Sequence, residues 1–276
     1  MSRTAIASAC AALFALVPLS TQAADWTDNS VSYRYGTSFN EPANSKDVTK
    51  NILNFTHVSG YKYGSNFFTV DILKSDKNDP ANNGGGGAQE LYAIYANQLH
   101  YGKITGSKIA LGPITDFAWT TRIDLNSKDD AFASRVQKLI LGPTIKFGGS
   151  WGWADLDFLS YKEKNHNGIV GKAVDFDLTW RVGGAWGVGF NAGPVPLKFN
   201  GWGTYTAGKG KDGFGVETKP ETWINAFLMV DAGKLMGGSK DTFLAGVGYE
   251  YVKNKFGSSG TGTKTSQPLL KLEWHL

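Results

Sequence analysis

Residues 173–182 (AVDFDLTWRV) alternate between apolar and polar side chains without a break, and no other feature constrains the fold as strongly. Side chains on a β-strand point to alternate faces, so Phe176 and Trp180 would share an apolar face. Asp175 and Asp177 would share the opposite, charged face. A soluble sandwich buries such an apolar face, whereas an outer-membrane barrel turns it to lipid and keeps the charged face in a wet lumen.

Similar alternation recurs along the chain and predicts an all-β fold. The length of 276 residues and the hydrophobic content of 41% suffice for one large domain. Outside the N-terminus there is no run of 18 apolar residues that would form a membrane-spanning helix. We expect twelve strands, at residues 31–35, 51–59, 66–73, 90–101, 114–124, 136–147, 151–162, 173–182, 196–206, 222–231, 243–252 and 267–276.

The predicted connections differ in length according to the strand that they follow. Several of those after even-numbered strands are tight glycine turns, although two are longer. Those after odd-numbered strands are polar and roughly 9 to 15 residues long: 36–50, 74–88, 125–135, 163–171, 207–221 and 253–265. This pattern indicates an all-β, transmembrane antiparallel β-barrel of about 12 strands, with a soluble sandwich or lipocalin-like fold as the alternative.

Tryptophans near the strand ends favour the barrel, because a membrane girdle would place them there. They are Trp151, Trp153, Trp186, Trp202, Trp223 and Trp274. Residues 129–141 also allow a helix, since Phe132, Val136 and Ile140 have helical spacing. A Gly-Pro pair at 142–143 would end such a helix, and we favour a loop that leads into the strand at 136–147.

The N-terminus predicts a cleaved signal peptide at residues 1–23, which leaves residues 24–276 as the barrel. Arg3 supplies the positive region, an apolar region follows, and Ala23 precedes the expected cleavage point. The single cysteine, Cys10, lies inside this segment, so the mature chain has no disulfide or cysteine-bound metal. We therefore expect an exported protein of the bacterial outer membrane. The net charge of +4 gives no reason to expect nucleic acid as a partner.

Three stretches resemble the Tsx-type nucleoside-specific channels and their OmpK-like relatives. They are NSVSYRYGTSFNEP, KNILNFTHVSGYKYGSNFF, and GYEYVKNKFG followed by a short amphipathic terminal strand. The similarity extends in order over nearly all of the mature chain, and residues 252–257 (VKNKFG) are its most specific element. The resemblance implies a monomeric twelve-stranded barrel with a narrow lumen that passes nucleosides. It also implies that some relatives serve as bacteriophage receptors through their outer loops.

The chain departs from this family at its C-terminus. Members usually end in an aromatic residue that the barrel-assembly machinery reads, whereas this chain ends in Leu276, two residues after Trp274. The expected partners are nucleosides, outer-membrane lipid and lipopolysaccharide, the barrel-assembly machinery, and bacteriophage. We also consider a less selective small-solute porin, and a surface or phage receptor in which transport is incidental.

A nucleoside channel needs aromatic faces that stack on a base and polar groups that replace water around the ribose. Strand phase alone predicts which side chains face the lumen. The inner-facing set is Arg34, Phe67, Asp71, Asp116, Arg122, Asp124, Asp175, Asp177, Arg181 and Glu250. Their mixed signs suit a neutral polar solute better than an ion. They either contact the solute or pair with one another and fill a narrow barrel.

We find no pattern that predicts an enzyme or a cofactor. Asp155 and Asp157 would share one strand face, as a metal site or a glycosidase pair requires, but alternation produces such pairs on any polar face. Residues 203–209 imitate a phosphate-binding loop but lack the hydroxyl residue and the helix that should follow. The four histidines have no metal-ligand spacing. His57 with Ser59 is the nearest approach to a lipase pair, and two residues apart on one strand is a poor match.

Overall fold

The computed structural model describes residues 24–82, 84–109, 111–128, 134–168 and 170–276. The predicted signal peptide and the start of the 129–141 segment lie outside these residues. The strands are β1 (Trp26–Phe39), β2 (Val48–Tyr61), β3 (Gly64–Ser75), β4 (Gln89–His100), β5 (Ile114–Lys128), β6 (Arg135–Gly149), β7 (Gly152–Asn167), β8 (Lys172–Asp175), β9 (Thr179–Ala192), β10 (Val195–Thr206), β11 (Glu221–Asp231), β12 (Phe243–Lys253) and β13 (Lys264–His275). The short helices are α2 (Tyr101–Thr105), α3 (Ala232–Leu235) and η1 (Lys255–Gly257).

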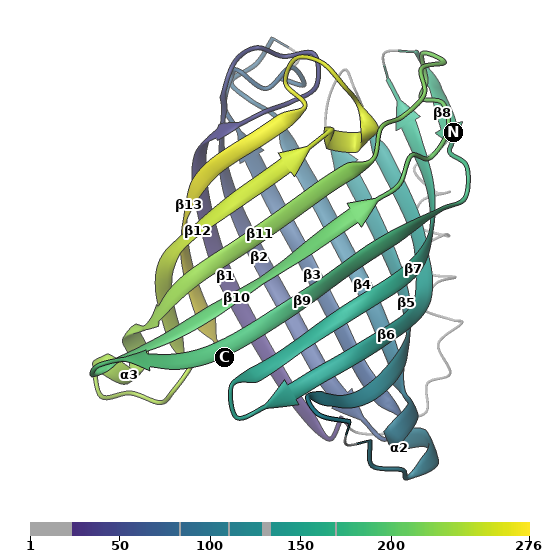
Figure 1. Cartoon of the computed structure of the whole chain (residues 1–276). Coiled ribbons are helices and arrows are strands. Elements are labelled where there is room, and N and C mark those ends of the chain that lie inside the picture. Colours follow the sequence, from purple (N-terminus) through teal and green to yellow (C-terminus); the bar gives the residue numbers. More distant parts are fainter. Residues whose placement is uncertain (1–23, 83, 110, 129–133, 169) are drawn as a thin grey trace.

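Twelve of these strands close into one antiparallel barrel, which confirms the expected fold class (Figure 1). Successive strands pair around the wall, with β7 paired to β9, β1 pairs with β13, and β6 pairs with β7 to complete the circle. The remaining strand, β8, pairs only with the end of β7. Closure leaves the barrel without an edge strand, so the backbone hydrogen bonds of the wall are satisfied within it. No helix within the described part of the chain is both long and apolar enough to cross a membrane.

The two ends of the barrel carry different connections, as the sequence predicts. At one end the strands are joined by residues 40–47, 76–88, 168–178, 207–220 and 254–263, which we call the loop end. At the other, the turn end, two-residue connections join β2 to β3, β6 to β7 and β9 to β10. The turn end also carries α2 and α3, the first residues of β1 and the last residues of β13 (Figure 1).

The outer surface of the wall is apolar, whereas a soluble barrel would present polar groups there. Alternate residues along the strands point outward, and many of them are large and exposed: Val31, Tyr33, Leu53, Phe55, Leu91, Tyr95, Trp119, Leu139, Phe158, Trp180, Leu228, Val247, Tyr249, Leu270, Leu272 and Trp274. Ring pairs such as Trp180 with Tyr205, whose centroids are 5.5 Å apart, lie within this surface. An apolar outer band with aromatic residues is the surface that a bilayer requires.

The girdle prediction holds for some tryptophans and is wrong for others. Trp186 and Trp274 face outward with the apolar band. Trp202 lies opposite the buried Asn225 in register, and the ring of Trp223 packs against the ring of Trp202 with centroids 6.1 Å apart. Both tryptophans therefore face the lumen. Trp153 also faces the lumen, because it lies opposite Gly187 on the inner face of β9.

The alternation at residues 173–182 breaks in the structure, and two predicted lumen residues are misplaced as a result. β8 ends at Asp175 and β9 begins at Thr179, so the expected single strand is two strands with different registers on β7. Phe176 turns inward and is 6% exposed, with the Lys209 ammonium 4.1 Å from its ring centre. Burial of this ring beside a cation outweighs the regular alternation.

Asp175 and Asp177 therefore do not face the lumen. The Asp175 carboxylate is 2.8 Å from the Lys162 ammonium on the outer side of the wall, and its side chain is 63% exposed. Asp177 is also exposed, and its backbone N–H donates to the Lys209 carbonyl at 2.9 Å. Beyond the break, Arg181 and Trp180 point inward and outward as predicted.

Two further expectations concern neighbouring segments. The strand favoured over a helix after residue 134 is confirmed as β6. The long connection expected between the predicted strands at 173–182 and 196–206 is wrong, because β9 continues to Ala192 and a turn of two residues, 193–194, leads into β10. The glycines of β9 are compatible with this longer strand, because a strand accepts glycine where a neighbouring aromatic ring occupies the space of a side chain.

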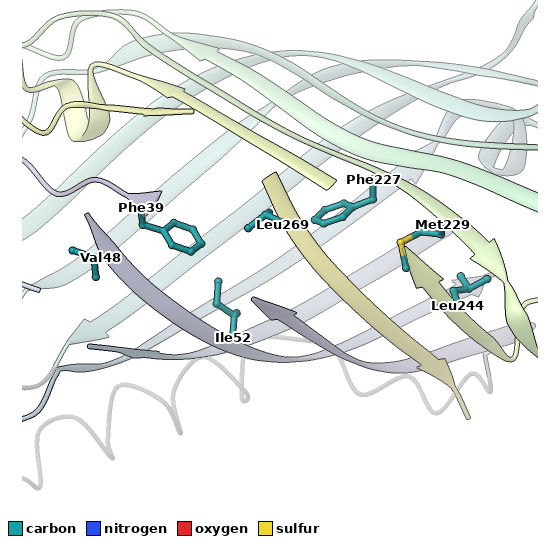
Figure 2. Close-up of a cluster of buried hydrophobic side chains, with 7 residues drawn as sticks. All are labelled: Phe39, Val48, Ile52, Phe227, Met229, Leu244 and Leu269. Atoms are coloured by element: carbon teal, nitrogen blue, oxygen red, sulfur yellow. The ribbon is translucent and has the colours of Figure 1, made fainter. Parts of the chain in front are cut away.

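Part of the inner face is apolar. Seven buried side chains from β1, β2, β11, β12 and β13 pack together along the inside of the wall: Phe39, Val48, Ile52, Phe227, Met229, Leu244 and Leu269. Figure 2 shows them as a row that runs from Phe39 and Val48 to Met229 and Leu244. Each is at most 5% exposed, so this side of the lumen is filled by packed side chains.

Candidate functional site

The loops at the loop end are tied to one another across the mouth of the barrel. Backbone and side-chain hydrogen bonds connect residues 76–88 to 40–47, 40–47 to 254–263, 254–263 to 207–220, and 207–220 to 168–178. The donors and acceptors are Asn44 Nδ2 and Asn78 O at 2.9 Å, Ala43 N and Thr261 O at 2.9 Å, Lys219 N and Gly257 O at 2.8 Å, and Asp177 N and Lys209 O at 2.9 Å. We call this interlocked set of five loops the cap.

Buried ion pairs hold the cap to the inner wall. Glu41 Oε1 is 2.5 Å from the Lys50 ammonium and 3.1 Å from the Lys255 ammonium, and all three side chains are buried. Two further pairs lie at the same end, with Lys128 and Asp79 at 2.8 Å and Lys209 and Glu163 at 2.6 Å. Between Tyr161, Glu221 and Phe256 a cavity of about 10 Å³ remains, which is roughly the room for one water molecule.

The electrostatics of the Glu41 cluster follow from its composition of one carboxylate and two ammonium groups. Burial alone would raise the pKa of Glu41, but attraction to Lys255 and Lys50 prevails and holds this pKa below its usual range. Burial and the repulsion of Lys50 together lower the pKa of Lys255, although Glu41 attracts its charge. The carboxylate is therefore the group on which the charge balance of the cap depends.

The middle of the lumen contains most of the predicted inner-facing residues, and they pair with protein groups. Arg34 and Asp71 form an ion pair of 2.6 Å. Arg122 donates to both oxygens of Asp124, at 2.6 and 2.9 Å, and Tyr92 donates to the same carboxylate at 2.8 Å. Such saturated pairs fill and stiffen a narrow barrel.

The other two charged residues of the middle are also engaged. Arg181 donates to the Thr206 hydroxyl at 2.8 Å, and its guanidinium lies 4.4 Å from the ring centre of Tyr161. Glu250 accepts a hydrogen bond from Asn225 at 2.8 Å and is 5% exposed. The alternative in which the lumen charges pair with one another therefore holds for Arg34 with Asp71 and for Arg122 with Asp124, whereas Arg181 and Glu250 bond neutral side chains.

Two predicted residues lie nearer the turn end. Asp116 accepts the backbone N–H of Gly102 at 2.9 Å, which holds the start of α2 against the barrel. Phe67 lies on the inner face of β3, opposite Val58 and Ala96, and is 38% exposed. An inward side chain with that much accessible surface borders open space, so the lumen is open to solvent beside Phe67.

A site that the sequence did not predict is built on β7, β9 and β10 and extends from Trp153 near the turn end to Trp202 in the middle of the lumen. The strand registers align two rungs across these strands, the first being Trp153, Gly187 and Asn200. The second rung is Asp155, Ala185 and Trp202. We call these six inner-facing residues the tryptophan site.

Between the two indole rings of the tryptophan site, the wall carries only the small residues Gly187 and Ala185. Glycine is required at 187 because a Cβ there would lie 2.7 Å from Nε1 of Trp153, whose ring lies across this position. Ala185 adds only a methyl group next to it. Trp153 and Trp202 are 49% and 38% exposed although they point inward, so their faces border open lumen. Two strand spacings separate the strands that carry them, roughly 10 Å.

Polar groups adjoin both rings. Lys146 donates to both oxygens of Asp155, at 2.9 and 2.8 Å, and to Gln98 at 2.7 Å. Asn200 Oδ1 is buried and has no hydrogen-bond partner within the described residues. A planar solute with polar edges would find stacking surfaces, a carboxylate and an ammonium within this one part of the wall.

The sequence contained a weak signal for this site. Residues 183–189 combine four glycines with an alanine in the middle of an expected barrel, which indicates a thin wall beside bulky neighbours. Register was needed to bring Trp153 and Trp202 next to that segment. Among the described residues, no group of three or more His, Cys, Asp or Glu is arranged to hold a metal ion.

The fold and its lumen together define a closed twelve-strand barrel of the outer-membrane type. No protein-family model matches the chain, and no curated protein matches it. Solved structures are similar at low identity. A KdgM porin shares 8% identity over 89% of this chain and 98% of that one, with a TM-score of 0.46.

Two autotransporter barrels are similar to the same extent. The translocator domain of NalP from Neisseria meningitidis shares 10% identity over 98% of this chain and 97% of that one, with a TM-score of 0.43. The β domain of the Bordetella autotransporter BrkA shares 12% identity over 91% and 99%, with a TM-score of 0.44. A likeness of this size says nothing about a ligand, which only the chain's own side chains can indicate.

Proposed function

We propose that this chain is a bacterial outer-membrane channel for the passive diffusion of small polar solutes. The apolar outer band, the closed wall and the loops gathered at one end support a membrane position with the loops outside the cell. The solvent-accessible inward side chains Phe67 and Trp153 near the turn end support a channel. The tryptophan site is the single observation that carries the proposal, because packing alone gives no reason to leave two indole rings half open inside a barrel.

The solute class that we propose is the nucleosides. A nucleobase is a planar ring that stacks on aromatic side chains, and stacking of this kind is worth about 1–3 kcal/mol per base. Trp153 and Trp202 supply the faces, while the Asp155 carboxylate supplies an acceptor for a hydroxyl or amino group of a nucleoside. The family resemblance of the sequence points to the same class. A less selective small-solute porin is the alternative, since a half-open lumen passes other solutes as well.

A liposome-swelling assay separates these alternatives. Liposomes that contain the refolded mature chain should admit adenosine and uridine several-fold faster than hexoses, although the hexoses are smaller. Trp274→Ala is the control, because it removes an outward-facing indole of the lipid band instead of a lumen indole. This variant should show the same solute preference as the parent protein. Equal rates for all solutes of one size would establish the less selective porin and reject nucleoside preference.

A second candidate role is attachment at the cell surface, including reception of bacteriophage. One observation favours it: the hairpin at residues 210–217 exposes Phe214 by 59% and Val216 by 57% beyond the wall. Deletion of the tip of this hairpin should leave solute flux intact. If it abolishes phage adsorption while flux persists, attachment is a separate function of the loops.

A further inference from the structure

A group of basic side chains stands on the outer surface at the loop end. Arg135 lies on β6, and three more lie on the outer face of β7. Their parity matches that of Leu139 and Phe158, which are exposed members of the apolar band. We call Arg135, Lys162, Lys164 and His166 the basic patch.

Strand register makes the basic patch compact. Arg135 is directly opposite His166 on the paired strand, at a Cβ separation of roughly 5 Å. Along β7 the three outward residues follow one another at every second position, roughly 7 Å apart. A tetrahedral anion placed on this surface would reach two or three of these side chains at once.

The patch has more positive charge than its surroundings neutralise. Asp175 faces it from β8, opposite Lys164 in register, and its carboxylate is 2.8 Å from the Lys162 ammonium. Within the described part of the chain, Arg135 and Lys164 have no acidic partner. These two cations therefore point outward without a counter-charge from the described residues.

The position of the patch relative to the apolar band identifies its ligand. Leu139 is opposite Lys162 in register and is 47% exposed. Trp180 is 53% exposed and is opposite Ser160 in register. Ser160 is the outward-facing residue of β7 that comes before Lys162. Along the outer face toward the loop end, the surface thus changes from apolar to aromatic to cationic within a few residues. The same order is found where acyl chains meet anionic headgroups.

We propose that the basic patch is a binding site for the phosphorylated headgroup of an outer-leaflet lipid of the lipopolysaccharide class. The headgroup phosphate contacts Arg135 and Lys164, and the acyl chains lie along Leu139 and Phe158. This inference rests on the proposed membrane position of the chain and is independent of which solute the lumen passes.

Titration of the detergent-solubilised, refolded protein with bis-phosphorylated lipid A tests the site. R135Q/K164Q should weaken binding about 25-fold, since each cation near an anionic headgroup contributes roughly fivefold. D175N should act in the opposite direction and strengthen binding, because it removes the carboxylate that faces the patch. The matched control K234Q/K240Q removes two exposed lysines at the turn end and should leave binding unchanged.

Three results would overturn the proposal. These are equal loss in R135Q/K164Q and K234Q/K240Q, equal affinity for dephosphorylated lipid A, and displacement of lipid A by an equimolar amount of inorganic phosphate. The last would assign the site to free phosphate. Heat-modifiable migration on gels verifies that each variant is folded, and K164Q alone replaces the double variant if that does not fold. Insertion into vesicles is measured separately, so a failure of the membrane position is distinguishable from a failure of the lipid site.

Discussion

At the loop end of the barrel, charged side chains are buried and paired, and the loops that carry them are bound to one another. Between the turn end and the middle of the lumen, by contrast, inward-facing aromatic side chains are left accessible beside residues with almost no side chain. Glu41, Lys50 and Lys255 represent the first arrangement, and Trp153 and Trp202 represent the second. The same alternating strands run through both ends, so the difference comes from what the connections and the small residues place inside.

The contrast separates two tasks that one lumen has to perform. Buried pairs fix the cap in one arrangement, because a charge in a low-dielectric site needs its partner in place. Open indoles bind weakly and release quickly, which a diffusion channel needs. A solute that enters from the loop end must therefore pass a rigid, ion-paired mouth before it reaches the stacking surfaces.

The largest effect is expected from Glu41→Gln, which would break the cap and leave the turn end intact. The substitution leaves Lys50 and Lys255 buried without their shared carboxylate, and loss of one partner of a buried pair costs about 3–5 kcal/mol. Urea titration in lipid vesicles should show this loss in the free energy of unfolding. The exposed Glu217→Gln at the same end is the control. An unchanged midpoint for Glu41→Gln would show that the cluster does not hold the cap.

The second effect concerns the tryptophan site. Trp202→Ala should weaken nucleoside block of the channel by 1–3 kcal/mol, about 5- to 150-fold, because it removes one stacking face. The free energy of unfolding should change less than with Glu41→Gln, since Trp202 is 38% exposed. Nucleoside should block the Trp274→Ala variant, which lacks an outward-facing indole, as strongly as it blocks the parent protein. Equal weakening in both variants would argue that the site plays no part in binding.

The third effect is a pH dependence of the cap. The pKa of Glu41 is depressed in the folded state, so its contribution to stability is present above its ordinary value of 4.5 and is lost as the pH falls through the folded value. After correction for the intrinsic exchange rate, the Glu41 contribution to the hydrogen-exchange protection of residues 40–47 should be constant from pH 8 to pH 5. Protection should decline below pH 4.5, and Glu41→Gln should remove that decline.

The smallest effect is expected from Asp175→Asn, at the same end but outside the barrel. Its ion pair with Lys162 is exposed, and such pairs contribute little to stability. The unfolding midpoint should match that of the parent protein. A loss comparable to that of Glu41→Gln would contradict the distinction between buried and exposed pairs that we draw at this end.

The sequence predicted the barrel because alternation and loop length are local patterns. Leu270 and Trp274 face lipid and Gln267 faces the lumen as their spacing requires. The break at Phe176 was not predictable, since its cause is a contact with Lys209 from a distant loop. For the same reason the tryptophan site was missed: its two rungs depend on the register of three strands, and strand phase alone does not give the register.

The most direct test of the central claim is single-channel conductance of the refolded mature protein in a planar bilayer, titrated with adenosine and then with glucose. We predict that adenosine blocks the open channel at micromolar to millimolar concentration, that glucose does not, and that Trp202→Ala loses the adenosine block. A steady conductance that responds to neither solute would contradict nucleoside binding in the lumen while leaving the barrel unchallenged.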